Sequence, residues 1–195
     1  LGWPVLEVPG IEADDAIGTL ARVAARAGVD VVISTGDKDL AQLVNERVTL
    51  VNTMTDSRYD RDGVKAKFDV WPEQIVDYLA LVGDTADGFP GLPGWGAKSA
   101  STVLAKYGEI MSIPESHEQW LHDGVKVRGA EKLATTLRTQ RADAELFRIL
   151  ATLVDTVDVG VVDDWCWHGP TDRFSNLMTE WGVPQLAERA GALAD

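Results

Sequence analysis

Cysteine is almost absent from this sequence, because Cys166 is the only one among 195 residues. A single cysteine excludes an internal disulfide framework and fits a reducing cytoplasm, so we expect Cys166 to be a small buried residue. Long apolar runs are absent too, since no stretch approaches the roughly 18 residues that span a bilayer. The first residues also lack a basic segment that leads into an apolar one. The composition therefore predicts a globular protein without a membrane segment.

Basic residues are scarce: the chain has 18 Lys and Arg against 31 Asp and Glu, a formal net charge of −13. This balance is unusual for a nucleic-acid binder, because phosphate contacts normally come from clustered basic side chains. The objection weakens if the acids surround divalent ions and the basic residues share one face. Candidates for such a face occur in the second half of the chain: Lys98, Lys106, Lys126, Arg128, Lys132, Arg138 and Arg141.

The first part of the chain alternates between extended and helical patterns. Residues 4–8 alternate apolar and polar side chains, as a short strand does, and apolar residues recur at helical spacing over 13–27. Residues 29–34 are dense in β-branched side chains, which predicts a strand buried on both faces of a parallel sheet. Residues 47–52 read as another strand. These patterns predict the α/β class, with a mostly parallel sheet and covering helices.

Helical patterns dominate the rest of the chain. We expect a polar connection over 53–62, then helices over 63–68, from Pro72 onward, and over 97–107, 128–139, 142–153, 172–181 and 184–193, with an extended segment over 157–162. In the helix over 142–153 we place Leu146, Phe147, Ile149 and Leu150 on the inward face. Three regions follow: an α/β portion over 1–70, a helix-hairpin-helix over 71–110, and a helical accessory region over 111–195.

Acidic residues cluster where the predicted sheet and its helix meet. Glu12, Asp14 and Asp15 lie at the start of the helix over 13–27, and Asp37 and Asp39 follow the strand over 29–34. Open parallel sheets place ligands at the carboxyl ends of their strands, so these side chains should converge. The alternative is local, because acids near a helix start are favoured by its dipole and Asp39 can be an N-cap. Lys38 is either a phosphate contact or a neutraliser of its acidic neighbours.

The segment over 79–100 joins two further acids to a glycine-rich turn. Asp84 and Asp87 stand at the end of a helix, where the macrodipole disfavours negative charge unless a cation compensates it. The turn that follows contains Gly91, Gly94 and Gly96, which leave room for a phosphate, and Lys98 opens the next helix. This helix-hairpin-helix therefore predicts a metal beside a nucleic-acid backbone.

The donor set indicates which metal this would be. The seven acids Glu12, Asp14, Asp15, Asp37, Asp39, Asp84 and Asp87 offer oxygen only, which selects Mg²⁺ or Mn²⁺ over zinc. His117 and His122 share no spacing with other zinc ligands and are expected at the surface. Two ions about 3.5–4 Å apart would relieve the repulsion among so many carboxylates and support phosphodiester hydrolysis.

Residues 83–100 resemble the helix-hairpin-helix of the flap endonuclease and 5'-3' exonuclease family, including the nuclease domain of bacterial DNA polymerase I. The family pattern is Gly-Asp-x-Ser-Asp-Asn-Ile-Pro-Gly-Val-Pro-Gly-Ile-Gly-x-Lys-Thr-Ala. Here Gly88 replaces Asn, Phe89 and Trp95 replace Ile, and Ser99 replaces Thr, while both aspartates and the lysine are in place. Glu-Ala-Asp-Asp over 12–15 and Thr-Gly-Asp-Lys-Asp-Leu over 35–40 are also similar to acidic motifs of this family.

The resemblance implies a PIN-like, Rossmann-like core and a structure-selective nuclease that cleaves DNA at 5' ends or flaps. It implies catalytic roles for Asp14, Asp15, Asp37 and Asp39, which belong to the set of seven metal ligands. It also implies a polymerase domain or polymerase protein as a partner, and a location in the cytoplasm at the nucleoid. A K⁺ ion could lie at the hairpin carbonyls, and no small-molecule cofactor is expected. DNA contacts are expected from Gly91, Gly94, Gly96, Lys98, Ser99, Arg128 and Lys132, although a solvated helix end would equally explain the last two.

Family members carry, ahead of the matched region, a strand with another aspartate and a basic helical arch, and this sequence contains neither. We therefore expect a fragment with weak or absent hydrolysis by these residues alone. Two other hypotheses stay open. One is a non-catalytic helix-hairpin-helix DNA-binding module with structural acids, and the other is a Rossmann-like hydrolase of phosphorylated small molecules, which leaves the hairpin unexplained.

Overall fold

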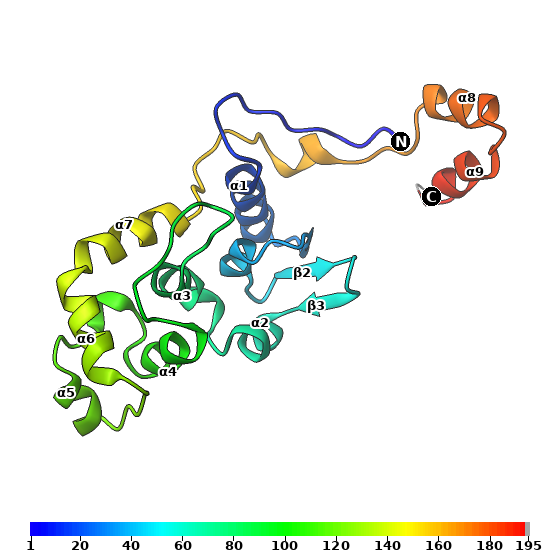
Figure 1. Ribbon diagram of the computed structural model, residues 1–195. Coiled ribbons are helices and arrows are strands. Elements are labelled where there is room, and N and C mark those ends of the chain that lie inside the picture. The colour runs from blue at the N-terminus through cyan, green and yellow to red at the C-terminus, as the bar shows by residue number, and fades with distance from the viewer. Residues whose placement is uncertain (194–195) are drawn as a thin grey trace.

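The structure, a computed structural model, describes residues 1–193 (Figure 1). It has a three-stranded sheet in the order β1-β2-β3. β1 (Val31–Ser34) runs parallel to β2 (Val48–Asn52), with Val31 opposite Val48. β3 (Ser57–Tyr59) pairs antiparallel with β2. The α/β class is confirmed, but the sheet is mixed, since the polar connection expected over 53–62 contains β3.

Two expectations about the first strands are wrong. Residues 4–8 form no strand and run along the surface, where Val5 is 77% exposed. β1 is not buried on both faces, because within the described chain it pairs only with β2 and leaves Val32 59% exposed. Alternating or β-branched residues favour extended backbone, but burial depends on which elements lie beside it.

α1 (Ala13–Arg26) covers the sheet and positions its first turn near the carboxyl end of β1. Its buried residues include Gly18, Ala21 and Ala24, and it packs against β1 and the 3₁₀ turn η1 (Asp39–Leu43). The predicted helix over 13–27 is confirmed to within one residue.

The helical body is built around α3 (Ile75–Val82), whose side chains are nearly all buried. α2 (Arg61–Phe68) and η2 (Pro72–Gln74) precede it, and α4 (Ala97–Tyr107) and α7 (Arg141–Ala151) pack against it. η3 (Ile110–Ser112), α5 (His117–His122) and α6 (Ala130–Thr139) lie between α4 and α7 in the sequence. One hydrophobic core runs from Ala21 in α1 to Ala151 in α7.

The inward face of α7 differs from the expected one. Ala144, Phe147 and Ala151 face the core, and the Phe147 ring stacks on Phe89 with centroids 5.7 Å apart. Leu146, Ile149 and Leu150 are 51%, 71% and 59% exposed. Two neighbouring stripes of this helix are apolar, and α3 covers only one of them.

The last part of the chain leaves this body through an extended segment. η4 (Val162–Trp165), α8 (Asp172–Glu180) and α9 (Gln185–Gly191) follow it, and Figure 1 shows α8 and α9 beside each other, away from α3 to α7. Cys166 is exposed, contrary to expectation, because its segment follows the surface. Among residues 1–193 no helix is both long and apolar enough to cross a membrane.

Candidate metal centre

A closed loop after α3 presents Asp84 and Asp87. The Asp84 amide donates to the Phe89 carbonyl at 2.9 Å, and the Phe89 amide donates back to the Asp84 carbonyl at 3.0 Å. Gly83 and Gly91 both have positive φ, at 90° and 68°, and their backbones cross in contact. A methyl group at Gly91 would overlap the backbone of Gly83, so packing explains this buried glycine.

Asp39, from the turn after β1, meets the two acids of this loop. One carboxylate oxygen from each of Asp39, Asp84 and Asp87 lies within 4.8 Å of the others. Asp39 is 5% exposed and Asp84 3%, whereas Asp87 is open to solvent. Lys38 forms an ion pair with Asp84, so in this structure it neutralises an acidic neighbour.

The electrostatics of these three acids favour a cation. Burial, then Asp87 and the charges of Asp37 and Asp84, raise the pKa of Asp39 to about 8. Burial opposes ionisation of Asp84, but the hydrogen bond and charge of Lys38 outweigh it and lower the Asp84 pKa. The Asp39 Oδ1 atom is buried and has no hydrogen-bond partner among residues 1–193. An orphaned carboxylate oxygen between two other carboxylates fits an oxygen-ligated divalent cation.

The other predicted acids surround this group. Glu12, Asp14, Asp15, Asp39 and Asp87 line one cavity of about 600 Å³. Burial, then the charges of Asp37 and Asp87 and of its acidic neighbours on α1, raise the pKa of Asp14.

Two of the surrounding acids also make backbone hydrogen bonds. Asp37 Oδ1 accepts from the Asp39 amide at 3.0 Å, and Asp15 Oδ1 accepts from the Val154 amide at 2.7 Å. The structure thus gathers all seven predicted acids, with three in direct convergence. Asp15 has one oxygen already engaged by the backbone.

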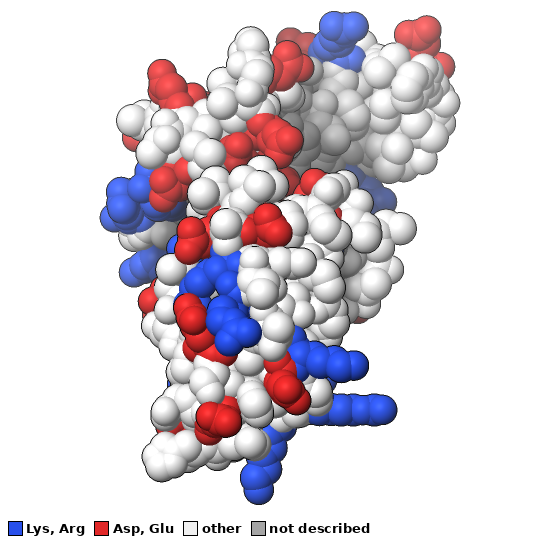
Figure 2. Space-filling view, turned by 60° about the vertical axis from the view of Figure 1, so that its left-hand side comes forward, with Lys and Arg blue, Asp and Glu red and all other residues white. Residues whose placement is uncertain are grey.

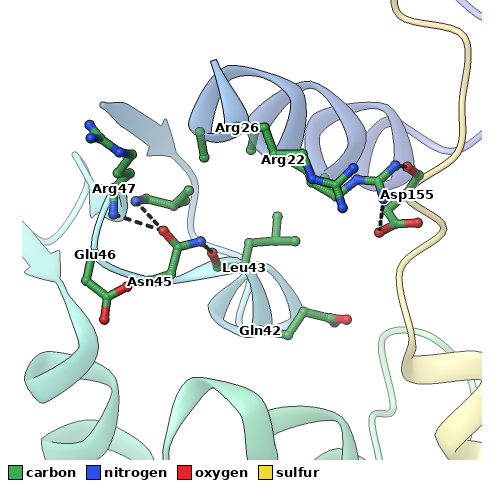
Figure 3. A pocket seen from close by; sticks show the side chains of 12 residues that line it. Arg22, Arg26, Gln42, Leu43, Asn45, Glu46, Arg47 and Asp155 are labelled. Atoms are coloured by element: carbon green, nitrogen blue, oxygen red, sulfur yellow. Dashed lines mark hydrogen bonds and ion pairs between the residues drawn. The ribbon is translucent and has the colours of Figure 1, made fainter. Parts of the chain in front are cut away.

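The wall opposite the acids is fixed by side chains that the sequence pattern does not reveal. Gln42 donates to the Ala151 carbonyl at 3.0 Å and accepts from the Leu153 amide at 3.1 Å. Arg22 forms an ion pair with Asp155 at 3.0 Å, at the edge of a separate cavity of about 490 Å³ (Figure 3). These partners lie more than a hundred positions apart in the chain, so no local pattern links them.

The predicted DNA contacts are placed at the start of α4 and near the start of α6. Lys98 is 86% exposed and pairs with Asp69 at 3.0 Å. The Ser99 hydroxyl accepts from the Gly96 amide and donates to the Gly96 carbonyl, so it caps α4. Gly94 is exposed and Gly96 partly exposed, which leaves their backbone accessible. Arg128 and Lys132 are exposed on either side of the α6 N-cap.

Basic side chains gather loosely at one end of the molecule. Figure 2 shows Lys and Arg projecting from the lower end, where α4, α5 and α6 lie, with acidic side chains between them. Exposed members of these elements and their connections are Lys98, Lys106, Lys126, Arg128, Lys132 and Arg138. Arg141 instead turns to the carbonyls of Ile110 and Met111, so it holds η3 in place.

Comparison with known proteins agrees with this arrangement. Residues 1–69 match the family described as "5'-3' exonuclease, N-terminal resolvase-like domain", and residues 70–173 match "5'-3' exonuclease, C-terminal SAM fold". The chain is 48% identical over 173 residues to DNA polymerase I of Pseudomonas aeruginosa, covering 89% of this chain and 19% of that protein. It is 38% identical over 163 residues to a 5'-3' exonuclease of Aquifex aeolicus, covering 84% and 52%.

Solved structures show the same fold. A bacteriophage T5 5'-exonuclease with bound zinc ions aligns with a TM-score of 0.66 and 21% identity, over 91% of this chain and 62% of that one. A T5 flap endonuclease complex with DNA and metal ions aligns with a TM-score of 0.65 and 21% identity, over 77% and 53%. The chain spans about half, or less, of the length of the two curated relatives named above. The two family matches together cover residues 1–173, and the chain therefore belongs to the 5'-3' exonuclease family.

Proposed function

We propose that this chain is the metal- and DNA-binding part of a structure-selective 5'-3' exonuclease or 5'-flap endonuclease. The observation that carries the proposal is the convergence of Asp39, Asp84 and Asp87, with a buried Asp39 oxygen that has no partner within the described chain. Hard oxygen ligands favour Mg²⁺ or Mn²⁺. Bound there, two such ions would activate a water molecule and stabilise charge on the phosphodiester.

The residues of the centre divide into four roles. Asp39, Asp84 and Asp87 would hold one ion directly, and Asp14, Glu12 and Asp37 would complete the shell around the cavity. Asp39 must release its proton as the cation binds, because ligating carboxylates are ionised. Lys38 screens Asp84 in the metal-free protein, and Asp15 orients the opposite wall through Val154.

The hairpin and α6 would hold the DNA by its backbone. Gly94, Gly96 and Lys98 present open backbone and a cation at the α4 N-terminus, and Arg128 and Lys132 flank the α6 N-terminus. Contacts of this kind position DNA without reading its sequence. A monovalent ion such as K⁺ at the hairpin carbonyls belongs to the same proposal, as does a polymerase domain as a covalent or separate partner.

Calorimetric titration with Mn²⁺, together with a 5'-flap cleavage assay in Mg²⁺, tests this proposal. Wild-type protein should show a divalent site that Asp84→Asn removes, and the weak Mg²⁺-dependent cleavage expected of this chain alone should fall to background in that variant. The matched control is Asp62→Asn, an exposed aspartate in the first turn of α2. A wild-type protein that binds flap DNA but takes up no Mn²⁺ would instead be a non-catalytic binding module.

A further inference from the structure

Asp69 ends α2 in a backbone conformation that normally belongs to glycine. Its φ is 61°, and Asp56 is the only other non-glycine residue with positive φ among residues 1–193. The Asp69 amide donates to the Lys65 carbonyl at 2.9 Å, so the left-handed residue closes the helix. A side chain in this conformation costs energy that glycine avoids, and the cost is tolerated where the side chain makes contacts of its own.

The Asp69 carboxylate joins the end of α2 to the first turns of α4. Its Oδ2 atom accepts from the Lys98 ammonium at 3.0 Å and from the buried Ser101 hydroxyl at 3.2 Å. The Lys65 ammonium lies 3.8 Å from Oδ1. The hydrogen bond from Lys98, and then the one from Ser101, lower the pKa of Asp69, so the carboxylate is ionised at neutral pH.

Two ammonium groups and a hydroxyl form a donor set that suits an oxyanion, and here the chain supplies that anion itself. The Asp69 side chain is 56% exposed and that of Lys98 is 86% exposed, so an outside anion can reach both. Lys98 stands in the first turn of α4, just after Gly94 and Gly96, whose backbone is accessible. A helix start with open backbone favours phosphate, and the proposed function brings the DNA backbone to this position.

We propose that Asp69 is an internal counter-anion for Lys98, which a DNA phosphate has to replace before Lys98 can contact the backbone. The inference rests on the proposed function and adds to it a residue that limits the affinity of the hairpin for DNA. The flexible Lys98 side chain turns to the phosphate, while Ser101 and Lys65 keep Asp69 in place. The phosphate then lies near a carboxylate that repels it, so the contact is weaker than one made by an unpaired lysine.

Fluorescence anisotropy with 5'-flap DNA in Ca²⁺ tests this replacement. Asp69→Asn removes the charge but keeps a residue that tolerates positive φ, and Asp69→Gly removes the side chain altogether. Both variants should bind the flap about 3-fold more tightly than the wild type, within the range that one exposed ion pair contributes. In a Lys98→Ala background the gain should vanish, because no ion pair is left to be replaced.

Asp56→Asn is the matched control, since Asp56 also has positive φ, at 50°, but lies in the turn between β2 and β3. It should leave the affinity unchanged. Unchanged affinity in both Asp69 variants would overturn the inference while leaving the proposed function intact. So would weaker binding, which would show that Asp69 holds Lys98 in position for DNA, or an equal gain with and without Lys98, which would show general charge repulsion. Failure of the wild-type protein to bind any flap DNA would overturn the proposed function itself.

Discussion

Replacing Asp39 with asparagine should stabilise the metal-free protein while abolishing its affinity for divalent ions. Asp39 is 5% exposed, and burial together with its acidic neighbours raises its pKa from 3.8 to about 8. Because the folded-state pKa lies above the unfolded value, the stability from this group is complete below pH 3.8 and is lost as the pH rises through about 8.

The pKa sets the magnitude. Each unit of pKa difference corresponds to about 1.4 kcal/mol. Ionisation of Asp39 therefore lowers the free energy of unfolding by at most roughly 5 kcal/mol at pH 8, and by under about 1 kcal/mol at pH 4. Asparagine is neutral at every pH and has nearly the same shape. We therefore expect Asp39→Asn to raise the free energy of unfolding by several kcal/mol at pH 8 and to leave it almost unchanged at pH 4.

Urea unfolding in EDTA at pH 4, 6 and 8, followed by circular dichroism, measures this difference. The same series in saturating Mg²⁺ should narrow the difference at pH 8, because an ion at about 100 times its dissociation constant stabilises only the wild type, by about 2.7 kcal/mol. Asp62→Asn, at an exposed position of α2, should follow the wild type throughout. A less stable Asp39→Asn protein in EDTA at pH 8, or a gain independent of pH, would refute the electrostatic reasoning.

Three further predictions concern other parts of the molecule. Arg148→Ala removes the ion-pair partner of Asp77, which lies 3.1 Å away and whose side chain is 3% exposed. This loss should lower the free energy of unfolding, measured in urea, by about 3 kcal/mol, and an unchanged midpoint would contradict it. Gly91→Ala should lower the melting temperature far more than Gly124→Ala, because both have positive φ but only Gly91 contacts other backbone. Lys98→Ala should weaken DNA binding equally for all sequences and reduce the slope of log affinity against log salt by about one, and an unchanged slope would exclude a phosphate contact.

Elements with sharp local ends were predictable from the sequence. The helix over 97–107 matches α4 at both ends, because Gly96 and Gly108 interrupt helical backbone on either side. The acids after β1 and at the start of α1 were also predictable as neighbours, since a helix that packs antiparallel to the strand that follows it brings its own start and the end of that strand to one edge of the sheet. Their convergence with Asp84 and Asp87 depended on the family resemblance, because no local pattern connects positions so far apart.

Features decided by distant packing were not predictable. Periodicity shows that α7 has apolar stripes, but only the position of α3 and Phe89 determines that Phe147 is covered while Ile149 is not. Gly91 looked like a phosphate-binding glycine, and its contact with Gly83 depends on how the chain crosses itself. Lys38 had two equal interpretations from its neighbours in sequence, and its pairing with Asp84 favours one of them in the metal-free protein.

The strong negative charge is compatible with DNA binding because the charge is not evenly distributed. Seven acids surround one centre, where burial and mutual repulsion already raise the pKa values of Asp14 and Asp39. Two divalent ions there would cancel four negative charges at the position where a phosphate must enter. The exposed basic side chains of α4 to α6 lie at the lower end in Figure 2, where they could contact the DNA backbone. DNA affinity should therefore depend on divalent ions as well as on monovalent salt, and EDTA should weaken flap binding more in wild type than in Asp84→Asn.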